Sequence, residues 1–272
     1  MRSDEAGKAA LEHLGFSVRK LPEMEEQKRA DFIATLGDVT LLVEAKLRRD
    51  NPTELKRMNA VLAEGEVYGS THKLGRNNSH SKNIRDGFEQ LMQEREEQHD
   101  YKVLLYVADC ENISVVCEQI VDTLYGATSA FVTTNGGVKE TRCYFYDPSE
   151  FFDNKEVDAA IVGYRYDDNW HLVLCLNSFS DRFINLRRSA LGQLFLGSTI
   201  DPLADEARGD AFIVGNDAPR LAGGDKAFAR HFPSMDPVLR HLESKYDLPP
   251  NTVVQGNMNA PLFIVRRAGD SG

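Results

Sequence analysis

The beginning of the chain carries a hydrophobic pattern that changes from a helical to a strand period. Between residues 3 and 14 the apolar side chains recur at helical spacing, and Ser3 and Gly15 stand where a helix start and a helix end are expected. Residues 16–20 are a short strand candidate directly after this helix. The pattern therefore predicts a helix followed by a strand.

Two apolar runs, 31–36 and 39–47, flank a Gly-Asp turn and predict a β-hairpin. The second run is apolar almost to its end, where Glu44 and Lys46 stand two residues apart. Because side chains alternate across a strand, these two charges point to the same face. Asp31 opens the neighbouring strand, so we expect its carboxylate to approach Glu44 across the hairpin.

The chain after the hairpin predicts two helices separated by a loop. An Asn-Pro-Thr-Glu start at residue 51 predicts a helix that runs to about residue 64. Residues 65–81 are rich in Gly, Ser, Asn and His, which is typical of a mobile loop. Residues 82–98 predict an amphipathic helix. Its inward-facing apolar side chains are expected to be Ile84, Phe88 and Leu91.

Strand and helix patterns alternate through the rest of the chain. The further predicted elements are a buried strand at 102–108, a helix at 112–125, strands at 129–134, 141–147, 157–166 and 170–177, helices at 183–196 and 234–246, and a strand at 261–265. This order predicts an α/β fold with a mixed central sheet flanked by helices, and an additional C-terminal α+β region.

An Asp-Pro-Ser sequence at 147–149 is the best candidate for a domain boundary. We therefore expect a first domain, 1–148, that contains the hairpin. The second part, 149–272, is expected to serve substrate selection or oligomerisation.

The composition is that of an ordinary globular protein. Of 272 residues, 42% are hydrophobic and 27% are charged. No apolar run reaches about 18 residues and no secretory leader is readable, so we expect a cytoplasmic protein without a membrane partner. The four cysteines form no C-x-x-C pair, which predicts buried, reduced thiols rather than a zinc or redox motif.

The charge is unevenly distributed along the chain. A net charge of −10 disfavours broad, non-specific coating of nucleic acid. Residues 46–85 nevertheless contain nine Lys or Arg and four Asp or Glu, a balance of +5. The basic residues that we expect to contact phosphates are Arg48, Arg49, Lys73, Arg76, Lys82 and Arg85. The alternative is a solvated surface without a ligand.

The charged end of the hairpin has the chemistry of a metal site. Two carboxylates, Asp31 and Glu44, together with the backbone carbonyl of Ala45 form an all-oxygen ligand set. Such a set suits Mg²⁺ or Mn²⁺, which prefer hard oxygen ligands. Lys46 on the same face can position a water and offset the charge of a phosphate. The alternative is an edge-strand salt bridge that reaches solvent.

The order of helix, strand, Asp-bearing hairpin, Glu-x-Lys, helix and strand over residues 3–108 resembles the core of the PD-(D/E)xK nuclease superfamily. The spacing is similar to that of archaeal Holliday junction resolvases and Mrr-type restriction enzymes. The resemblance implies a restriction-endonuclease-like fold in which Asp31 and Glu44 hold Mg²⁺ or Mn²⁺ and Lys46 positions the nucleophile. The family's proline before the Asp is absent, because Ala30 stands there.

The resemblance also implies two supporting residues. Many members add a Glu from the first helix, for which Glu5 is the candidate and Asp4 and Glu12 are alternatives. Members related to exonucleases carry a Gln on the helix after the motif. Gln90 occupies that place, with Gln93 as a competitor.

These residues together predict a metal-dependent nuclease that hydrolyses phosphodiester bonds, with DNA favoured over RNA and an endonuclease favoured over an exonuclease. The family implies a homodimer, or a partner protein held through 149–272. Two alternatives remain open. One is a nuclease-like fold that binds nucleic acid without turnover, and the other is a protein-interaction module without nucleic acid.

Two histidines, His72 and His80, lie in the predicted loop. Zinc ligation would need further nitrogen or sulfur donors in register, and none are present. A role for one of them as a general acid stays open.

Overall fold

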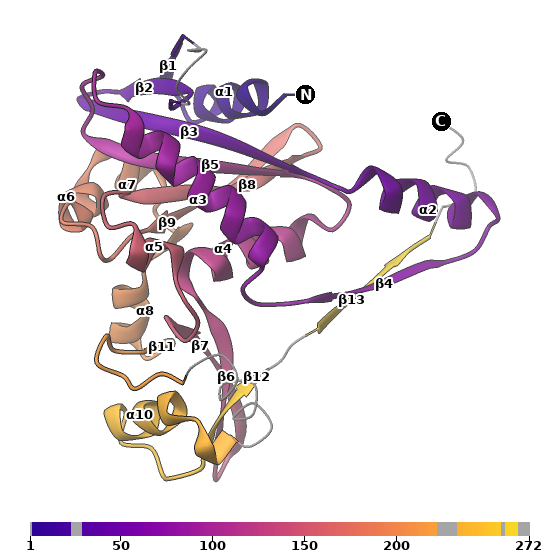
Figure 1. Ribbon diagram of the computed structural model, residues 1–272, viewed down its shortest axis with the longest axis vertical. Helices are drawn as coiled ribbons and strands as arrows, with labels where there is room; N and C mark the ends of the chain where they lie inside the picture. The colour runs from indigo at the N-terminus through magenta and orange to yellow at the C-terminus, as the bar shows by residue number, and fades with distance from the viewer. Residues whose placement is uncertain (1, 23–28, 222–232, 257–258, 266–272) are drawn as a thin grey trace.

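The computed structural model describes residues 2–22, 29–221, 233–256 and 259–265. It is a mixed α/β fold built on a seven-stranded sheet of order β1-β2-β3-β5-β8-β9-β10 (Figure 1). These strands are β1 (Ser17–Lys20), β2 (Phe32–Leu36), β3 (Val39–Arg49), β5 (Tyr101–Asp109), β8 (Ala159–Tyr166), β9 (Asn169–Leu176) and β10 (Thr199–Ile200). The predicted α/β class and helix-flanked central sheet are thus confirmed.

The strand directions divide the central sheet into an antiparallel and a parallel part. β1, β2 and β3 form an antiparallel meander. β3, β5 and β8 run parallel to one another, so their carboxyl ends lie along one edge of the sheet. β9 returns antiparallel to β8, and β10 pairs parallel with β9.

Helices cover both faces of this sheet. On one face α1 (Ser3–His13), α6 (Phe183–Arg188) and α7 (Ala190–Leu194) share a buried cluster with Leu41 and Val43 of β3. On the other, α3 (Asn78–Gln93) and α4 (Ile113–Tyr125) pack on Leu42 and Leu104. The strand residues alternate between the two clusters, as the pleat requires. The inward-facing residues of α3 are Ile84, Phe88 and Leu91, as predicted.

Two smaller sheets complete the fold. A four-stranded sheet has the order β11-β7-β6-β12, and a two-stranded one pairs β13 with β4. Their strands are β4 (Tyr68–Lys73), β6 (Thr128–Thr134), β7 (Gly137–Tyr144), β11 (Ala211–Ile213), β12 (Val253–Gly256) and β13 (Asn259–Ile264). The remaining helices are α2 (Pro52–Ala63), α5 (Glu150–Asp153), α8 (Pro202–Arg208), α10 (Pro237–Lys245) and the 3-10 turn η1 (Pro233–Met235).

An arm formed by α2, β4 and β13 extends from the end of β3 and returns to the start of α3 (Figure 1). The prediction of a loop over 65–81 is therefore wrong for most of this stretch. β4 is a strand because β13, far along the chain, supplies its antiparallel partner. The helix α3 begins earlier than predicted because the Asn77 side chain accepts a hydrogen bond from the backbone N–H of Ser79, 2.9 Å away.

The expected division at 147–149 does not separate the sheets. β8, β9 and β10 come from the second half of the chain but belong to the central sheet. Conversely, β6 and β7 of the first half pair with β12 and β11 of the second. The central sheet and the four-stranded sheet are thus each built from strands of both halves of the chain.

Several element ends also differ from the predictions. The helix expected over 183–196 is interrupted at Ser189, whose side chain caps α7 by accepting from the backbone N–H of Gly192. α3 ends at Gln93 rather than near residue 98, because the carboxylate of Glu94 accepts hydrogen bonds from the backbone beyond it. None of the described helices combines the length and the apolarity that crossing a bilayer requires.

Candidate functional site

The charged end of β3 lies directly beneath α3. Both Glu44 and Lys46 occupy the face of β3 that α3 covers, and the point of closest approach is Gly87. A Cβ atom there would lie 2.7 Å from Cδ1 of Leu104, 3.1 Å from Cε of Lys46 and 3.5 Å from Cγ of Glu44. The missing side chain thus lets α3 approach the two charged residues closely.

Asp31 stands beside the same stretch of β3. Its backbone N–H donates to the carbonyl of Val43, with an N–O distance of 3.0 Å, and so extends the β2 ladder by one residue. The Oδ2 atom of Asp31 accepts a hydrogen bond of 2.9 Å from the backbone N–H of Ala45. The carboxylate is therefore fixed beside β3 at the start of β2.

The Glu44 carboxyl is the most buried charged group of this cluster. Its residue is 2% exposed, and its Oε2 atom is buried without a hydrogen-bond partner among the described residues. Burial raises the pKa of Glu44 to about 8; the charge of Asp31 adds to this rise and Lys46 opposes it. Burial likewise raises the pKa of Asp31, against the hydrogen bond from Ala45.

Lys46 and Gln90 link the strand to the helix above it. The Nζ atom of Lys46 lies 2.6 Å from Oε1 of Glu44 and also donates to Oε1 of Gln90. The Gln90 amide in turn donates to the backbone carbonyl of Arg29, 3.5 Å away. Four residues singled out in the sequence thus meet in one place: Asp31, Glu44, Lys46 and Gln90.

Glu5 does not join this cluster. Its carboxylate accepts a 2.8 Å hydrogen bond from the backbone N–H of Arg2 and is 54% exposed, so it serves the start of α1. The residue of α1 that reaches the cluster is Ser3, whose Oγ donates to the carbonyl of Ala45 at 2.7 Å. From the sequence Ser3 is expected only to mark the start of the helix, and no local pattern predicts its contact with Ala45.

The two alternatives to Glu5 have other partners. The Asp4 carboxylate binds Nζ of Lys20 at 2.8 Å, and its charge contributes to the raised pKa of Asp31. Glu12 lies 3.7 Å from Nζ of Lys8 on the exposed side of α1. Asp4 is therefore the α1 acid that acts electrostatically on the cluster.

The basic residues that were predicted to contact phosphates differ in their exposure and in their ion-pair partners. Arg49 lies 3.4 Å from the carboxylate of Asp109, and Arg85 lies 3.6 Å from that of Glu150, although both guanidinium groups are half exposed. Lys82 is exposed on α3. These three side chains remain accessible to a ligand.

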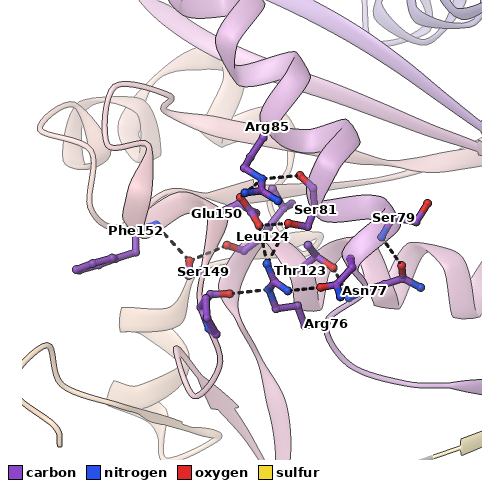
Figure 2. A network of polar contacts seen from close by, with 12 residues as sticks. Arg76, Asn77, Ser79, Ser81, Arg85, Thr123, Leu124, Ser149, Glu150 and Phe152 are labelled. Carbon is purple, nitrogen blue, oxygen red and sulfur yellow. Dashed lines mark hydrogen bonds and ion pairs between the residues drawn. The ribbon is translucent and has the colours of Figure 1, made fainter. Parts of the chain in front are cut away.

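Arg76 is held inside the protein. Its guanidinium lies 3.0 Å from the buried carboxylate of Glu150 and donates to Ser81, Asn78 and the carbonyl of Pro148 (Figure 2). Ser81 also donates to Glu150. This network ties the start of α3 to α5, so Arg76 has a structural role.

A cavity of about 650 Å³ lies between the arm and the end of β3. Arg48, two residues beyond Lys46 and on the same face of β3, lines it together with Lys73. Its lining does not include Asp31, Glu44, Lys46 or Gln90. The cavity is therefore a neighbour of the carboxylate cluster along β3 and not the same site.

Both histidines line this cavity. His80 is 1% exposed, with Nδ1 3.3 Å from Oη of Tyr106. Burial lowers the pKa of His80 to about 4, and the charge of Arg48 adds to this. His80 is thus neutral near pH 7 and holds no imidazolium proton for a leaving group. His72 lies 2.9 Å from Oγ of Ser70.

No group of three or more His, Cys, Asp or Glu side chains is arranged for a metal ion in the described ranges. The cluster at β3 offers two carboxylates and a backbone carbonyl. Comparison with family models, with curated proteins and with solved structures finds no match to the chain. What the protein does has to follow from these residues alone.

Proposed function

We propose that this protein is a metal-dependent nuclease of the PD-(D/E)xK type, with a restriction-endonuclease-like core, which hydrolyses phosphodiester bonds in nucleic acid, DNA foremost. One observation carries the proposal: Asp31, Glu44, Lys46 and Gln90 meet where β2 begins beside the middle of β3. An isolated salt bridge would account for Glu44 and Lys46 but not for the second, partly buried carboxylate beside them.

The cluster fits a hard divalent cation such as Mg²⁺ or Mn²⁺. Burial raises the pKa of both carboxyl groups, and the negative charge of Asp31 raises the pKa of Glu44 further. A cation relieves this repulsion, and the unpartnered Oε2 of Glu44 offers it an oxygen ligand. Asp31, Glu44 and the carbonyl of Ala45 would hold it, since that carbonyl keeps a second lone pair besides the one bound to Ser3.

The bound cation would supply Lewis-acid polarisation of a phosphate and a water of lowered pKa. The residues of the chain prepare the site for this. Lys46 offsets the charge of Glu44, and its ammonium can turn toward an anionic phosphate oxygen that enters the site. Gln90 accepts from Lys46 and so keeps the ammonium in place when Glu44 binds the cation. The Ala45 N–H fixes the orientation of Asp31.

The order of elements supports the same proposal. An antiparallel meander, β1 to β3, leads into the parallel strand β5, with α1 on one face and α3 on the other. This is the arrangement that the resemblance over residues 3–108 implies.

The test is cleavage of labelled single-stranded, duplex and branched DNA and of RNA by the full chain. We expect cutting with Mg²⁺ or Mn²⁺ and none with EDTA. Asp31→Asn, Glu44→Gln and Lys46→Ala should each lower the rate by about 100-fold or more, because each removes a group that acts on the reacting phosphate.

The matched control is Glu89→Gln on the exposed side of α3, which should retain the parent rate. Thermal melting of Glu44→Gln should show an intact fold, because the amide keeps the shape of the side chain and its oxygen can still accept from the Lys46 ammonium. The proposal fails if every substrate stays intact with both metals, or if the three site variants cut as fast as the parent.

A second candidate is a protein of the same fold that binds nucleic acid without cutting it. The near-complete burial of Glu44 favours this candidate. It predicts salt-dependent DNA binding together with no metal-dependent cutting.

A further inference from the structure

The cavity beside the carboxylate cluster has two walls of different origin. The arm supplies Leu55 and Met58 from α2, Tyr68 from β4 and Leu262 from β13. The body of the protein supplies the opposite wall from the end of β3 and the first turns of α3 and α4. Its volume, about 650 Å³, lies within the roughly 300–1,000 Å³ typical of sites for small ligands.

Two cations in this cavity have no ion-pair partner in the described parts of the chain. They are Arg48, which is partly buried, and Lys73, which is exposed. The third lining cation, Arg76, is neutralised by Glu150. Arg48 and Lys73 therefore suit an anionic group, and a phosphate is the anion that Arg and Lys bind most commonly in such sites.

The same cavity also contains carboxylates, which a simple anion would avoid. Asp50 accepts a hydrogen bond from the backbone N–H of Glu111, and Glu54 accepts one from the hydroxyl of Tyr68. Each carboxylate has further lone pairs to accept with. A ligand that complements this lining thus has a phosphate at one end and N–H donors at another.

The remaining lining suits a flat, hydrogen-bonding ring. The arm side presents apolar side chains such as Leu55 and Met58 beside polar ones such as Glu54, and the body side presents the side-chain amides of Asn77, Asn112 and Gln119. Side-chain amides supply both donors and acceptors. Nucleobases carry acceptors beside their donors, and proteins read them with Asn and Gln side chains.

We propose that this cavity binds one nucleotide, with its phosphate at Arg48 and Lys73 and its base between the arm and the amides. The proposal rests on the proposed function and specifies its substrate. Arg48 follows Lys46 on the same face of β3, about 7 Å along the strand, so a nucleic-acid strand at the carboxylates reaches the cavity directly. A base that lies between the two walls of the cavity cannot be paired with a second strand at the same time. The substrate class is therefore nucleic acid with an unpaired segment or end.

The test is equilibrium binding in EDTA, where no cleavage occurs. Titration calorimetry uses AMP and dAMP, with adenosine and inorganic phosphate as partial ligands, and fluorescence anisotropy uses a labelled single-stranded hexanucleotide and a duplex of equal length. We expect the nucleotides to bind at least about tenfold more tightly than either partial ligand, since only they engage both walls. The hexanucleotide should outcompete the duplex.

Three variants locate the binding. Arg48→Gln with Lys73→Gln should weaken nucleotide and hexanucleotide by about tenfold or more, because the phosphate loses both charges. Leu55→Trp, which fills the cavity from the arm side, should do the same without changing a charge. Arg165→Gln removes a cation near the end of β8 that is paired with Asp168, outside the cavity, and should leave binding unchanged. Thermal melting shows that each variant is folded.

The outcomes distinguish a nucleic-acid strand from a free nucleotide as the ligand of the cavity. A hexanucleotide that binds more tightly than AMP identifies a strand as the ligand and supports the proposal. Free nucleotide that binds more tightly than the hexanucleotide overturns the strand as ligand. Binding that is equal in parent, double variant and Leu55→Trp overturns the site altogether. Asp31 does not line the cavity, so Asp31→Asn should slow cleavage and leave binding in EDTA unchanged. A failure of the nuclease and a failure of this site are therefore distinguishable.

Discussion

At the scale of single residues, the cluster in β3 is an ion pair between one buried carboxylate and one lysine. Glu44 has a raised pKa because burial disfavours its charge, and Lys46 supplies the neighbouring positive charge. The ammonium of Lys46 donates to both Glu44 and Gln90. If the proposed cation took up the Glu44 carboxylate, Gln90 would remain as the partner of this ammonium.

His80 gives the fold a measurable sensitivity to acid. The unfolded chain takes up the proton at its ordinary pKa of 6.5, whereas the folded chain takes it up only at about 4. The contribution of His80 to stability is therefore fully present above pH 6.5 and is lost as the pH falls toward 4. The size of this loss is about 3 kcal/mol.

Urea denaturation between pH 7 and pH 4 measures this effect. We expect His80→Gln to flatten the decline in unfolding free energy over that window, whereas His13→Gln, at an exposed position on α1, should leave it as in the parent. An identical decline in His80→Gln and parent would contradict the prediction.

At the scale of elements, the contact between α3 and β3 depends on Gly87. In an exposed helix, Gly→Ala stabilises by up to about 1 kcal/mol. Here the added methyl group would press on Leu104 and Lys46, so we expect Gly87→Ala to destabilise by about 1–3 kcal/mol and to slow cleavage by displacing Lys46.

Denaturant unfolding and the cleavage assay check this expectation together. Glu89→Ala, two residues further along the exposed side of α3, should change the unfolding free energy by less than about 0.5 kcal/mol. Gly87→Ala that is more stable than the parent would show that α3 does not approach β3 as closely as described.

Elements whose pattern is local in the sequence were predictable, and elements that depend on a distant partner were not. The hairpin and the apolar stripe of α3 are local patterns, so Glu44 and Lys46 could be singled out from their spacing, whereas Gln90 was implied only by the resemblance to a nuclease family. The arm could not, because β4 is a strand only through pairing with β13, far away in sequence. The hydrogen bond from Ser3 to Ala45 could not be predicted for a similar reason, because it depends on how α1 packs across β3.

At the scale of the whole molecule, the two halves of the chain are interwoven. β5 lies between β3 and β8, and β6 lies between β7 and β12. A fragment of residues 1–148 would expose the β8-facing edge of β5 and the β12-facing edge of β6. We therefore expect this fragment to be unfolded or aggregated, without a cooperative melting transition.

Circular dichroism and size-exclusion chromatography of the fragment, beside the full chain, test this. Addition of the separately produced 149–272 fragment should restore soluble, folded protein, since it carries the missing strands. A fragment 1–148 that is monomeric and melts cooperatively on its own would contradict the interwoven topology.

The pairing of β13 with β4 also has a consequence for the order in which the parts of the fold form during synthesis. Ribosomes deliver β13 after all the other described strands, so a growing polypeptide has the carboxylates of the β3 cluster long before it has the last wall of the arm. For a nuclease such as the one proposed, which would be made beside messenger RNA, this order would delay completion of the proposed nucleotide cavity until synthesis has passed β13.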